Sequence, residues 1–213
     1  YGRLEGSYHI PVAAVIEGHI TKKADVLKLS NKVLTNKIIL PGRFKRVYVK
    51  QGNGKVFFGG NEIGQLDPTN KKYLSLSRHS ERIKNELTLK MNMILVTRSG
   101  TVGKVAIVPQ HWENCIANEH VLRVESKEPY HGLIYTWLNS EYGKILITRQ
   151  IYGSVVDEIT DEQIGEIIVP IFKDESITVH ITELIDKANS LRYEAYKQEQ
   201  RAIEIMNQEV LGL

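Results

Sequence analysis

The sequence is poor in cysteine and has no long apolar run, and each shortage excludes a class of protein. Cys115 is the only cysteine among 213 residues, which excludes an internal disulfide framework and favours a reducing compartment. The sequence contains no run of about 18 apolar residues, so it predicts no transmembrane helix. We therefore expect a cytoplasmic protein that has no membrane partner.

Sequence patterns for nucleotide and metal chemistry are also missing. Residues 100–104 read Gly-Thr-Val-Gly-Lys, but a phosphate loop needs a longer spacing between its glycines and Ser or Thr after the lysine. No Gly-x-Gly-x-x-Gly run opens a helix, and His111, Cys115 and His120 form only a weak zinc pattern. Nuclease chemistry would need clustered carboxylates to hold a metal, but residues 41–104 offer only Glu62, Asp67, Glu81 and Glu86, without diagnostic spacing. The sequence also lacks the Asn/Asp-Pro-Pro-Tyr/Phe run of amino-methyltransferases. We predict no catalytic residue, no metal site and no cofactor; a nuclease or transferase with unrecognised motifs stays the alternative.

What the sequence does have is a concentration of positive charge in its middle. Residues 41–104 contain 13 Lys and Arg against 4 Asp and Glu, whereas residues 105–172 contain 4 against 10. Residues 173–213 contain 5 against 8, and the whole chain carries only +3. A basic block within a nearly neutral chain is typical of a surface that binds a polyanion. A solvated face without a ligand is the simpler alternative, because Lys and Arg are mostly exposed in any protein.

The residue types in and near this block favour double-stranded DNA as the polyanion. Arg and Lys attract phosphates of any sequence, while Arg and Asn also form specific hydrogen bonds with base edges. Residues 98–101 (Arg-Ser-Gly-Thr) are the preferred contact loop, because Gly100 permits the backbone to come close to a ligand. The predicted DNA-binding residues are Arg43, Lys45, Arg46, Asn61, Arg78, Ser80, Arg82, Arg98, Ser99, Thr101, Lys104 and Ser154.

Hydrophobic patterning predicts an α+β fold, mixed and rich in strands, with peripheral helices. Asn53-Gly54 lies between two β-rich runs and predicts a hairpin. Thr160 and Gln163 have the spacing of a helix capping box. The expected strands are residues 44–50, 55–59, 93–97, 102–108 and 115–124. Strand 102–108 is expected to pair with strand 93–97 through the tight link of residues 98–101. The expected helices are residues 10–20, part of 77–90, and 133–147 with an interruption at Gly143.

From Asp174 onward the sequence predicts one long helix, residues 173–213, behind a domain of residues 1–172. The segment has no Gly or Pro before Gly212, and a heptad register fits most of it. Alanine at three successive equivalent positions would let a partner helix approach closely. That partner lies in this domain, in a further part of a longer chain, or in a second copy. The predicted pairing residues are Leu184, Ala188, Leu191, Ala195, Ala202 and Ile205.

Several of these motifs, in this order, resemble the target-recognition domains of specificity subunits in type I restriction–modification systems. Residues 89–108 resemble the family's strand, its Ser-Gly-Thr-x-Gly-Lys turn and its following apolar strand. Residues 117–124 resemble the family's next strand, residues 135–143 its helix, and residues 153–154 with 159–170 its closing segment. The long C-terminal helix resembles the spacer helix.

The resemblance implies a non-catalytic module that recognises one half of a split DNA target. It would direct methyltransferase subunits, and in the full complex a restriction subunit, to that half-site. Family members usually carry two such domains whose spacer helices pack antiparallel. This chain, which starts at Tyr1 without an initiator Met, is then either cut from a longer subunit or a half-subunit that pairs with itself as a homodimer. The recognition domain of a single-chain restriction–methylation enzyme is the related alternative.

The sequence departs from the family's pattern in two places. Asn92-Met93 stands where the family usually has Gly-Asp, and residues 1–41 match none of its motifs. The first departure affects a turn and none of the predicted DNA contacts. The role of the N-terminal segment therefore has to come from the structure.

Overall fold

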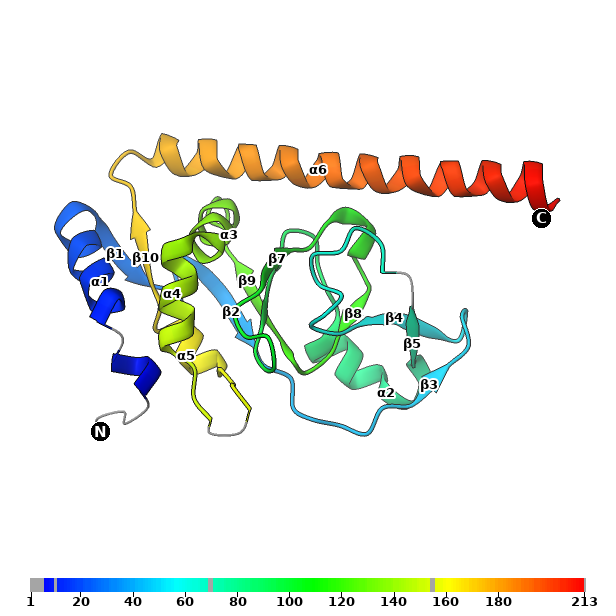
Figure 1. The fold of residues 1–213 in the computed structure, drawn as a ribbon, viewed down its shortest axis with the longest axis horizontal. Coiled ribbons are helices and arrows are strands. Elements are labelled where there is room, and N and C mark those ends of the chain that lie inside the picture. Colours follow the sequence, from blue (N-terminus) through cyan, green and yellow to red (C-terminus); the bar gives the residue numbers. More distant parts are fainter. Residues whose placement is uncertain (1–5, 10, 69–70, 154–155, 213) are drawn as a thin grey trace.

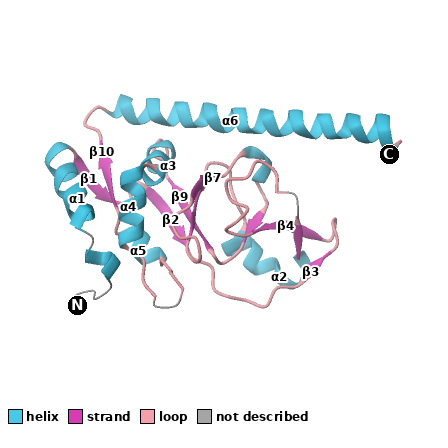
Figure 2. Ribbon diagram, in the orientation of Figure 1, coloured by secondary structure: helices cyan, strands magenta, loops and turns pink. Residues whose placement is uncertain are grey.

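A long C-terminal helix runs along one side of a mixed α+β domain (Figure 1). The computed structural model describes residues 6–9, 11–68, 71–153 and 156–212. Within these ranges the strands form three small sheets, with helices at one end of the domain and beside the sheets (Figure 2). The fold class expected from the sequence is confirmed. No helix among the described residues is long and apolar enough to cross a membrane.

Helices and strands occur in groups along the chain. The helices are η1 (Gly6–His9), α1 (Pro11–Lys23), α2 (Leu76–Arg82), η2 (Ile83–Leu87), η3 (Gln110–Trp112), α3 (His131–Asn139), α4 (Glu141–Arg149), α5 (Asp161–Gly165), α6 (Glu175–Met206) and η4 (Asn207–Leu211). The strands are β1 (Asp25–Lys28), β2 (Thr35–Ile39), β3 (Tyr48–Val49), β4 (Gly54–Phe58), β5 (Lys72–Ser75), β6 (Ile94–Thr97), β7 (Val105–Ile107), β8 (Ile116–Ala117), β9 (Val121–Ser126) and β10 (Ile168–Ile171).

The central sheet has the order β2-β9-β6-β7 and is antiparallel throughout. Every residue of β6 is buried, because the sheet is covered on both faces. Ile94 and Val96 pack into one hydrophobic core with α1, α3 and α4, while Leu95 packs into a second core with Phe58 and Trp112. The predicted pairing of residues 93–97 with 102–108 is confirmed by the β6–β7 ladder.

The second sheet has the order β3-β5-β4-β8, and it corrects the predicted hairpin. β3 and β4 do not pair with each other, because β5 lies between them and pairs antiparallel with both. Residues 51–52 still form a turn, but β5, which follows the polar loop after β4, lies between β3 and β4 in the sheet. The Asn-Gly turn signal therefore predicted both strands correctly, but it predicted that they pair with each other, whereas each pairs with β5. The predicted strand region 115–124 is also divided, since β8 joins this sheet and β9 the central one.

The predicted helix over residues 133–147 is two helices, and the break falls at Ser140 rather than at Gly143. Ser140 Oγ caps α4 by accepting a hydrogen bond from Gly143 N at 3.1 Å. Gly143 lies inside α4, where a Cβ atom would collide with the carbonyl oxygen of Trp137 in α3. The glycine therefore permits close packing of the two helices. The Thr160–Gln163 capping box at the start of α5 is confirmed.

α6 is 32 residues long and begins after Asp174, whose side chain caps its first turn. Its three buried residues, Thr178, Thr182 and Asn189, are all polar. Thr182 Oγ1 donates to Pro129 O at 2.5 Å, beside Gly132 of α3, where there is no room for a Cβ atom. The long helix predicted from residue 174 is confirmed, and one of its faces packs on its own domain. The division at residues 172 and 173 into separate units stays a prediction.

A polar network joins the middle of α6 to the domain. Asn189 Nδ2 donates to Asn92 Oδ1 and to Val108 O, both at 3.0 Å. Asp186 Oδ1 accepts hydrogen bonds from Asn92 Nδ2 at 3.1 Å and from the buried His131 at 2.8 Å. Asn92 has a positive φ of 63°, a conformation that asparagine tolerates better than most residues. Asn92, the departure from the family's Gly-Asp, thus serves both the turn and the attachment of the helix.

Candidate nucleic-acid interface

A cleft of about 430 Å³ lies between the β3-β5-β4-β8 sheet and the loops at the end of the central sheet. Two aromatic rings form part of its wall, with Tyr48 and Phe57 edge to face at 5.9 Å. Each ring carries a cation, because Lys72 lies 5.9 Å from the Tyr48 ring and Arg46 5.5 Å from the Phe57 ring. We call this the central cleft. Its lining residues are Arg46, Tyr48, Phe57, Gly59, Gly60, Asn61, Glu62, Lys72, Ser99, Gly100, Asn118, His120 and Val156.

The predicted Ser-Gly-Thr turn forms one rim of the central cleft. Gly100 and Gly103 have positive φ values of 74° and 88°, which explains why glycine occupies both positions. Thr97 Oγ1 closes the loop by accepting from Lys104 N at 2.9 Å and by donating to the Thr101 carbonyl oxygen. The tight link predicted between β6 and β7 is confirmed. Gly100 and Thr101 are exposed at its tip.

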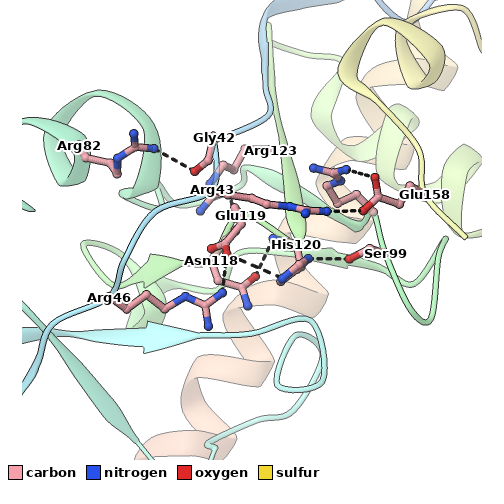
Figure 3. A network of polar contacts seen from close by, with 11 residues as sticks. Gly42, Arg43, Arg46, Arg82, Ser99, Asn118, Glu119, His120, Arg123 and Glu158 are labelled. Carbon is pink, nitrogen blue, oxygen red and sulfur yellow. Dashed lines mark hydrogen bonds and ion pairs between the residues drawn. The ribbon is translucent and has the colours of Figure 1, made fainter. Parts of the chain in front are cut away.

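A second rim comes from the β8–β9 loop, residues 118–120. Ser99 Oγ and His120 Nδ1 are 2.6 Å apart, which joins this loop to the Ser-Gly-Thr turn (Figure 3). Asn118 Oδ1 accepts from His120 N at 2.9 Å, so the loop is also closed internally. The sequence reasoning assigned these residues to a strand and missed them as site residues. The available signal was the polar run Asn-Glu-His between apolar neighbours.

The β8–β9 loop is held from inside by Arg123, whose side chain is fully buried. Its guanidinium donates to Asn118 O at 3.0 Å and to Val121 O at 2.5 Å, and also reaches the carbonyl oxygen of Ala117. Burial lowers the pKa of Arg123 to about 9, against the opposing influence of Glu86 and Glu119. A buried cation bonded to backbone carbonyls positions the loop without pointing toward a ligand. Arg123 is therefore a positioning residue.

The arginines around the central cleft are paired with carboxylates. Arg46 lies 2.5 Å from Glu119, which is buried beside it. Burial alone would lower the pKa of Arg46, but hydrogen bonds to Glu119 and Tyr48 raise it above its ordinary value. Arg43 and Arg98 both contact Glu158, at 3.0 and 2.6 Å. These pairs hold the guanidinium groups in defined positions.

The structure brings only part of the predicted DNA-binding set together. Arg46, Asn61 and Ser99 line the central cleft, and Lys104 Nζ lies 3.3 Å from Asn61 O. Arg43 and Arg98 meet at Glu158, and Thr101 lies on the exposed turn. Lys45 is exposed next to Arg46, and Ser154 lies outside the described residues.

Arg78, Ser80 and Arg82 lie apart from the central cleft, on α2. Arg82 donates to Gly42 O at 3.0 Å and to Glu86 at 2.8 Å, and its guanidinium lies 5.0 Å from the Phe44 ring. Arg78 and Ser80 are exposed on the same helix. For all residues of the set, a contact with DNA stays a prediction. Among the described residues no cluster of His, Cys, Asp and Glu could hold a metal ion.

The predicted pairing residues of α6 form a stripe on a different side of the helix from the three buried residues. Leu184, Leu191 and Ile205 are 53%, 60% and 45% exposed. Ala195 and Ala202 are also exposed, and Ala188 is half-buried. We call these six residues the apolar stripe. The structure places them together on one side of the helix, where they remain accessible in the single chain.

This arrangement of sheets, loops and attached helix is the fold of the S subunits of type I restriction–modification systems. A structure of the S subunit from M. genitalium matches with a TM-score of 0.51 at 12% identity, covering 77% of this chain and 39% of that chain. The HsdS subunit from Thermoanaerobacter tengcongensis matches with a TM-score of 0.55 at 14% identity, covering 92% of this chain and 51% of that one.

A third solved chain comes from work on complex assembly and conformational transition of the type I R-M system. It matches with a TM-score of 0.55 at 15% identity and covers 95% of this chain and 52% of the solved chain. The present chain thus spans about half the length of these proteins, or less. No family model and no curated protein matches the sequence significantly. At such low identities the likeness defines the fold alone.

Proposed function

We propose that this chain is a sequence-specific DNA-binding module of a type I restriction–modification specificity subunit. It binds one half-site of a split target in double-stranded DNA through the central cleft and its two rims. The single observation that carries the proposal is that the S-subunit fold holds this cleft, which is lined by the paired Arg46 and bordered by an exposed Ser-Gly-Thr turn. Loops held by a rigid scaffold are suitable places for recognition, because the scaffold fixes their geometry.

The chemistry of the central cleft matches the two parts of DNA recognition. Arg43, Arg46 and Lys104 offer cations to phosphates, which supplies affinity for any sequence. Asn61, Ser99 and the side chains of residues 118–120 offer donors and acceptors to base edges, which supplies discrimination. In this function the chain itself is non-catalytic, and a methyltransferase subunit and, in the full complex, a restriction subunit perform the chemistry. A cytoplasmic location follows from that role.

Selection from a random duplex library tests the proposal directly. We expect the purified chain to enrich one short sequence, and its affinity for DNA to fall linearly with the logarithm of the salt concentration. Incubating the chain with DNA and S-adenosylmethionine should give neither methylation nor cleavage. Failure to enrich any sequence, or a flat response to salt, would refute DNA reading. Methylation or cleavage by the chain alone would support the alternative of an enzyme.

The apolar stripe supports a second proposal, that the chain pairs through α6 with another spacer helix. The stripe contains two leucines more than half exposed and three alanines at heptad spacing. Exposed apolar rows with small residues are suited to close helix packing. The partner is a second copy or a further part of a longer subunit, and pairing of two copies favours a palindromic split target.

Ala195→Glu tests this pairing, because it places a charge in a close-packed seam. We expect the dimer to dissociate, measured as a halving of the mass in light scattering at constant protein concentration. Glu199→Ala, an exposed change elsewhere on the helix, serves as the control and should leave the mass unchanged. A wild-type chain that stays monomeric at high concentration would argue against self-pairing and leave only a longer subunit.

A further inference from the structure

One carboxylate, Glu158, holds two of the arginines beside the central cleft. Its Oε1 lies 3.0 Å from Arg43 (Figure 3). Its Oε2, the other oxygen of the same carboxylate, lies 2.6 Å from Arg98. Tyr152 also donates its hydroxyl to Oε2 at 3.2 Å. Two cations therefore share one negative charge. The group as a whole carries a net charge of +1, where two free arginines would offer +2.

The backbone fixes Glu158 in this position. Glu158 and Tyr152 exchange backbone hydrogen bonds of 2.8 and 2.9 Å, and Ile159 N donates to Arg98 O at 2.9 Å. An isolated bridge also joins Glu158 to Ser99, in the turn that forms the rim of the central cleft. The carboxylate is thus attached to the recognition turn itself, and its position depends on the geometry of that turn.

The two arginines differ in how easily each can dissociate from Glu158. The Arg98 side chain is 10% exposed and the Glu158 side chain 17%, so separating them would leave buried charges without partners, at high cost. The Arg43 side chain is 72% exposed, and an ion pair open to solvent contributes little stability. Arg43 can therefore exchange Glu158 for another anion, while Arg98 remains in place and keeps Glu158 neutralised.

We propose that Glu158 is a specificity-determining residue that restrains Arg43 until a duplex is seated in the central cleft. In the free protein Glu158 competes with DNA phosphate for Arg43. Non-specific DNA therefore forms one fewer ion pair with the protein, because Arg43 stays on Glu158. A correctly seated half-site places a phosphate within reach of Arg43, which then leaves Glu158 and binds that phosphate. The carboxylate thereby lowers non-specific affinity more than specific affinity. This inference rests on the proposed function, because it assumes that the central cleft binds duplex DNA.

Glu158→Gln tests the competition, since glutamine keeps the size and an acceptor oxygen but removes the charge. Binding is measured over a range of salt concentrations with a fluorescent duplex of random sequence and with the duplex enriched by selection. We expect non-specific affinity to rise by about threefold at physiological salt, with a steeper salt dependence, because one more cation becomes available. Affinity for the selected duplex should change less, so the specificity ratio falls.

Two further variants assign the effect to Arg43 rather than to net charge. Arg43→Ala combined with Glu158→Gln should return non-specific affinity to the wild-type value. Glu166→Gln makes the same change in net charge but removes the partner of Lys28, an exposed pair with side chains 58% and 55% accessible. We expect Glu166→Gln to leave non-specific affinity nearly unchanged. An equal rise in Glu166→Gln and Glu158→Gln would overturn the inference in favour of a general charge effect.

Arg43→Ala alone keeps the inference testable even if Glu158→Gln unfolds. Because Glu158 restrains Arg43 when no half-site is seated, this variant should lose more affinity for the selected duplex than for the duplex of random sequence. Equal losses on both duplexes would contradict the inference. These outcomes are distinct from failure of the proposed function, in which the wild-type chain enriches no sequence at all.

Discussion

The two sides of α6 differ in chemistry, although they belong to one helix. The side that packs on the domain buries Thr178, Thr182 and Asn189, whereas the apolar stripe, with Leu184 and Leu191, is exposed. A globular protein normally buries the apolar side of a helix. The difference indicates that the helix attaches to its own domain through directional polar contacts and close packing. Its apolar surface remains exposed in the single chain.

Directional contacts determine the orientation of a helix more tightly than apolar contacts, since hydrogen bonds depend on angle as well as distance. Here they occur along the length of the helix, at Thr182, at Asp186 with Asn189, and at Gln200, which donates to Asp67 at 3.1 Å. His111 adds ring stacking, with ring centroids 4.2 Å from Tyr196 and 6.0 Å from Tyr193. The apolar stripe is thereby held at a defined angle to the central cleft.

The largest effect is expected where α6 comes closest to the domain. Gly132→Val introduces a side chain against Thr182, whose backbone Cα would lie even closer to the new Cβ atom than its Oγ1 at 2.7 Å. We expect the free energy of unfolding to fall by about 3 kcal/mol, because backbone cannot move aside as a side chain can. Urea denaturation measures the change. Gly18→Ala is the matched control: its Cβ meets no atom within 4 Å, and a helical alanine should stabilise α1 by about 1 kcal/mol. A stable Gly132→Val variant would show that the helix can detach without cost.

A smaller effect is expected from the polar network. Asn189→Leu removes the hydrogen bonds to Asn92 and Val108 and leaves the Val108 carbonyl oxygen without this donor. The expected loss is about 2 kcal/mol of unfolding free energy. Leu184→Asn makes the reverse exchange in the apolar stripe and should change the stability of the isolated chain by less than about 0.5 kcal/mol. Equal losses for both variants would mean that the two sides of α6 do not differ as described.

The smallest effect concerns pH. Burial lowers the pKa of His111 below 6.5, against a hydrogen bond from its Nε2 to Leu66 O at 2.8 Å. Because the folded-state pKa is depressed, the unfolded chain binds more protons as the medium is acidified. The stability contributed by neutral His111 is present above pH 6.5 and is lost as the pH falls through the folded-state pKa. His111→Phe keeps an aromatic ring beside Tyr196 and should show a weaker fall in melting temperature on acidification. An identical pH dependence in both proteins would refute this role.

Local features of the fold could be predicted where neighbouring residues decide the structure. The Ser-Gly-Thr turn depends on Gly100 and Gly103, which adopt positive φ, and the α5 cap depends on Thr160 and Gln163. The long helix follows from the absence of Gly and Pro over residues 174–211. The strand pairing around Asn53-Gly54 was predicted wrongly, because β5, which follows a long loop after β4, pairs with both β3 and β4 in place of their pairing with each other.

The candidate site was predictable in composition and not in geometry. The basic block contains Arg43, Arg46 and Lys104, and all three do lie in or beside the central cleft. The carboxylate partners of the two arginines lie in the acidic stretch that follows. Glu119, the partner of Arg46, is 73 residues away along the chain, and Glu158, the partner of Arg43, is 115 residues away. No pattern of spacing indicates such pairs, since only folding brings them within reach.

The sequence by itself determined the elements of this protein: a basic middle segment, a tight glycine turn between two buried strands, and one uninterrupted C-terminal helix. These properties depend on backbone preferences and on charges that every conformation of the chain carries. The tertiary structure alone decided which side of α6 meets the domain, which strand enters the second sheet, and that Glu158 pairs with Arg43. Each of those depends on contacts between residues far apart in the chain, whose energies exist only after the backbone has brought them together.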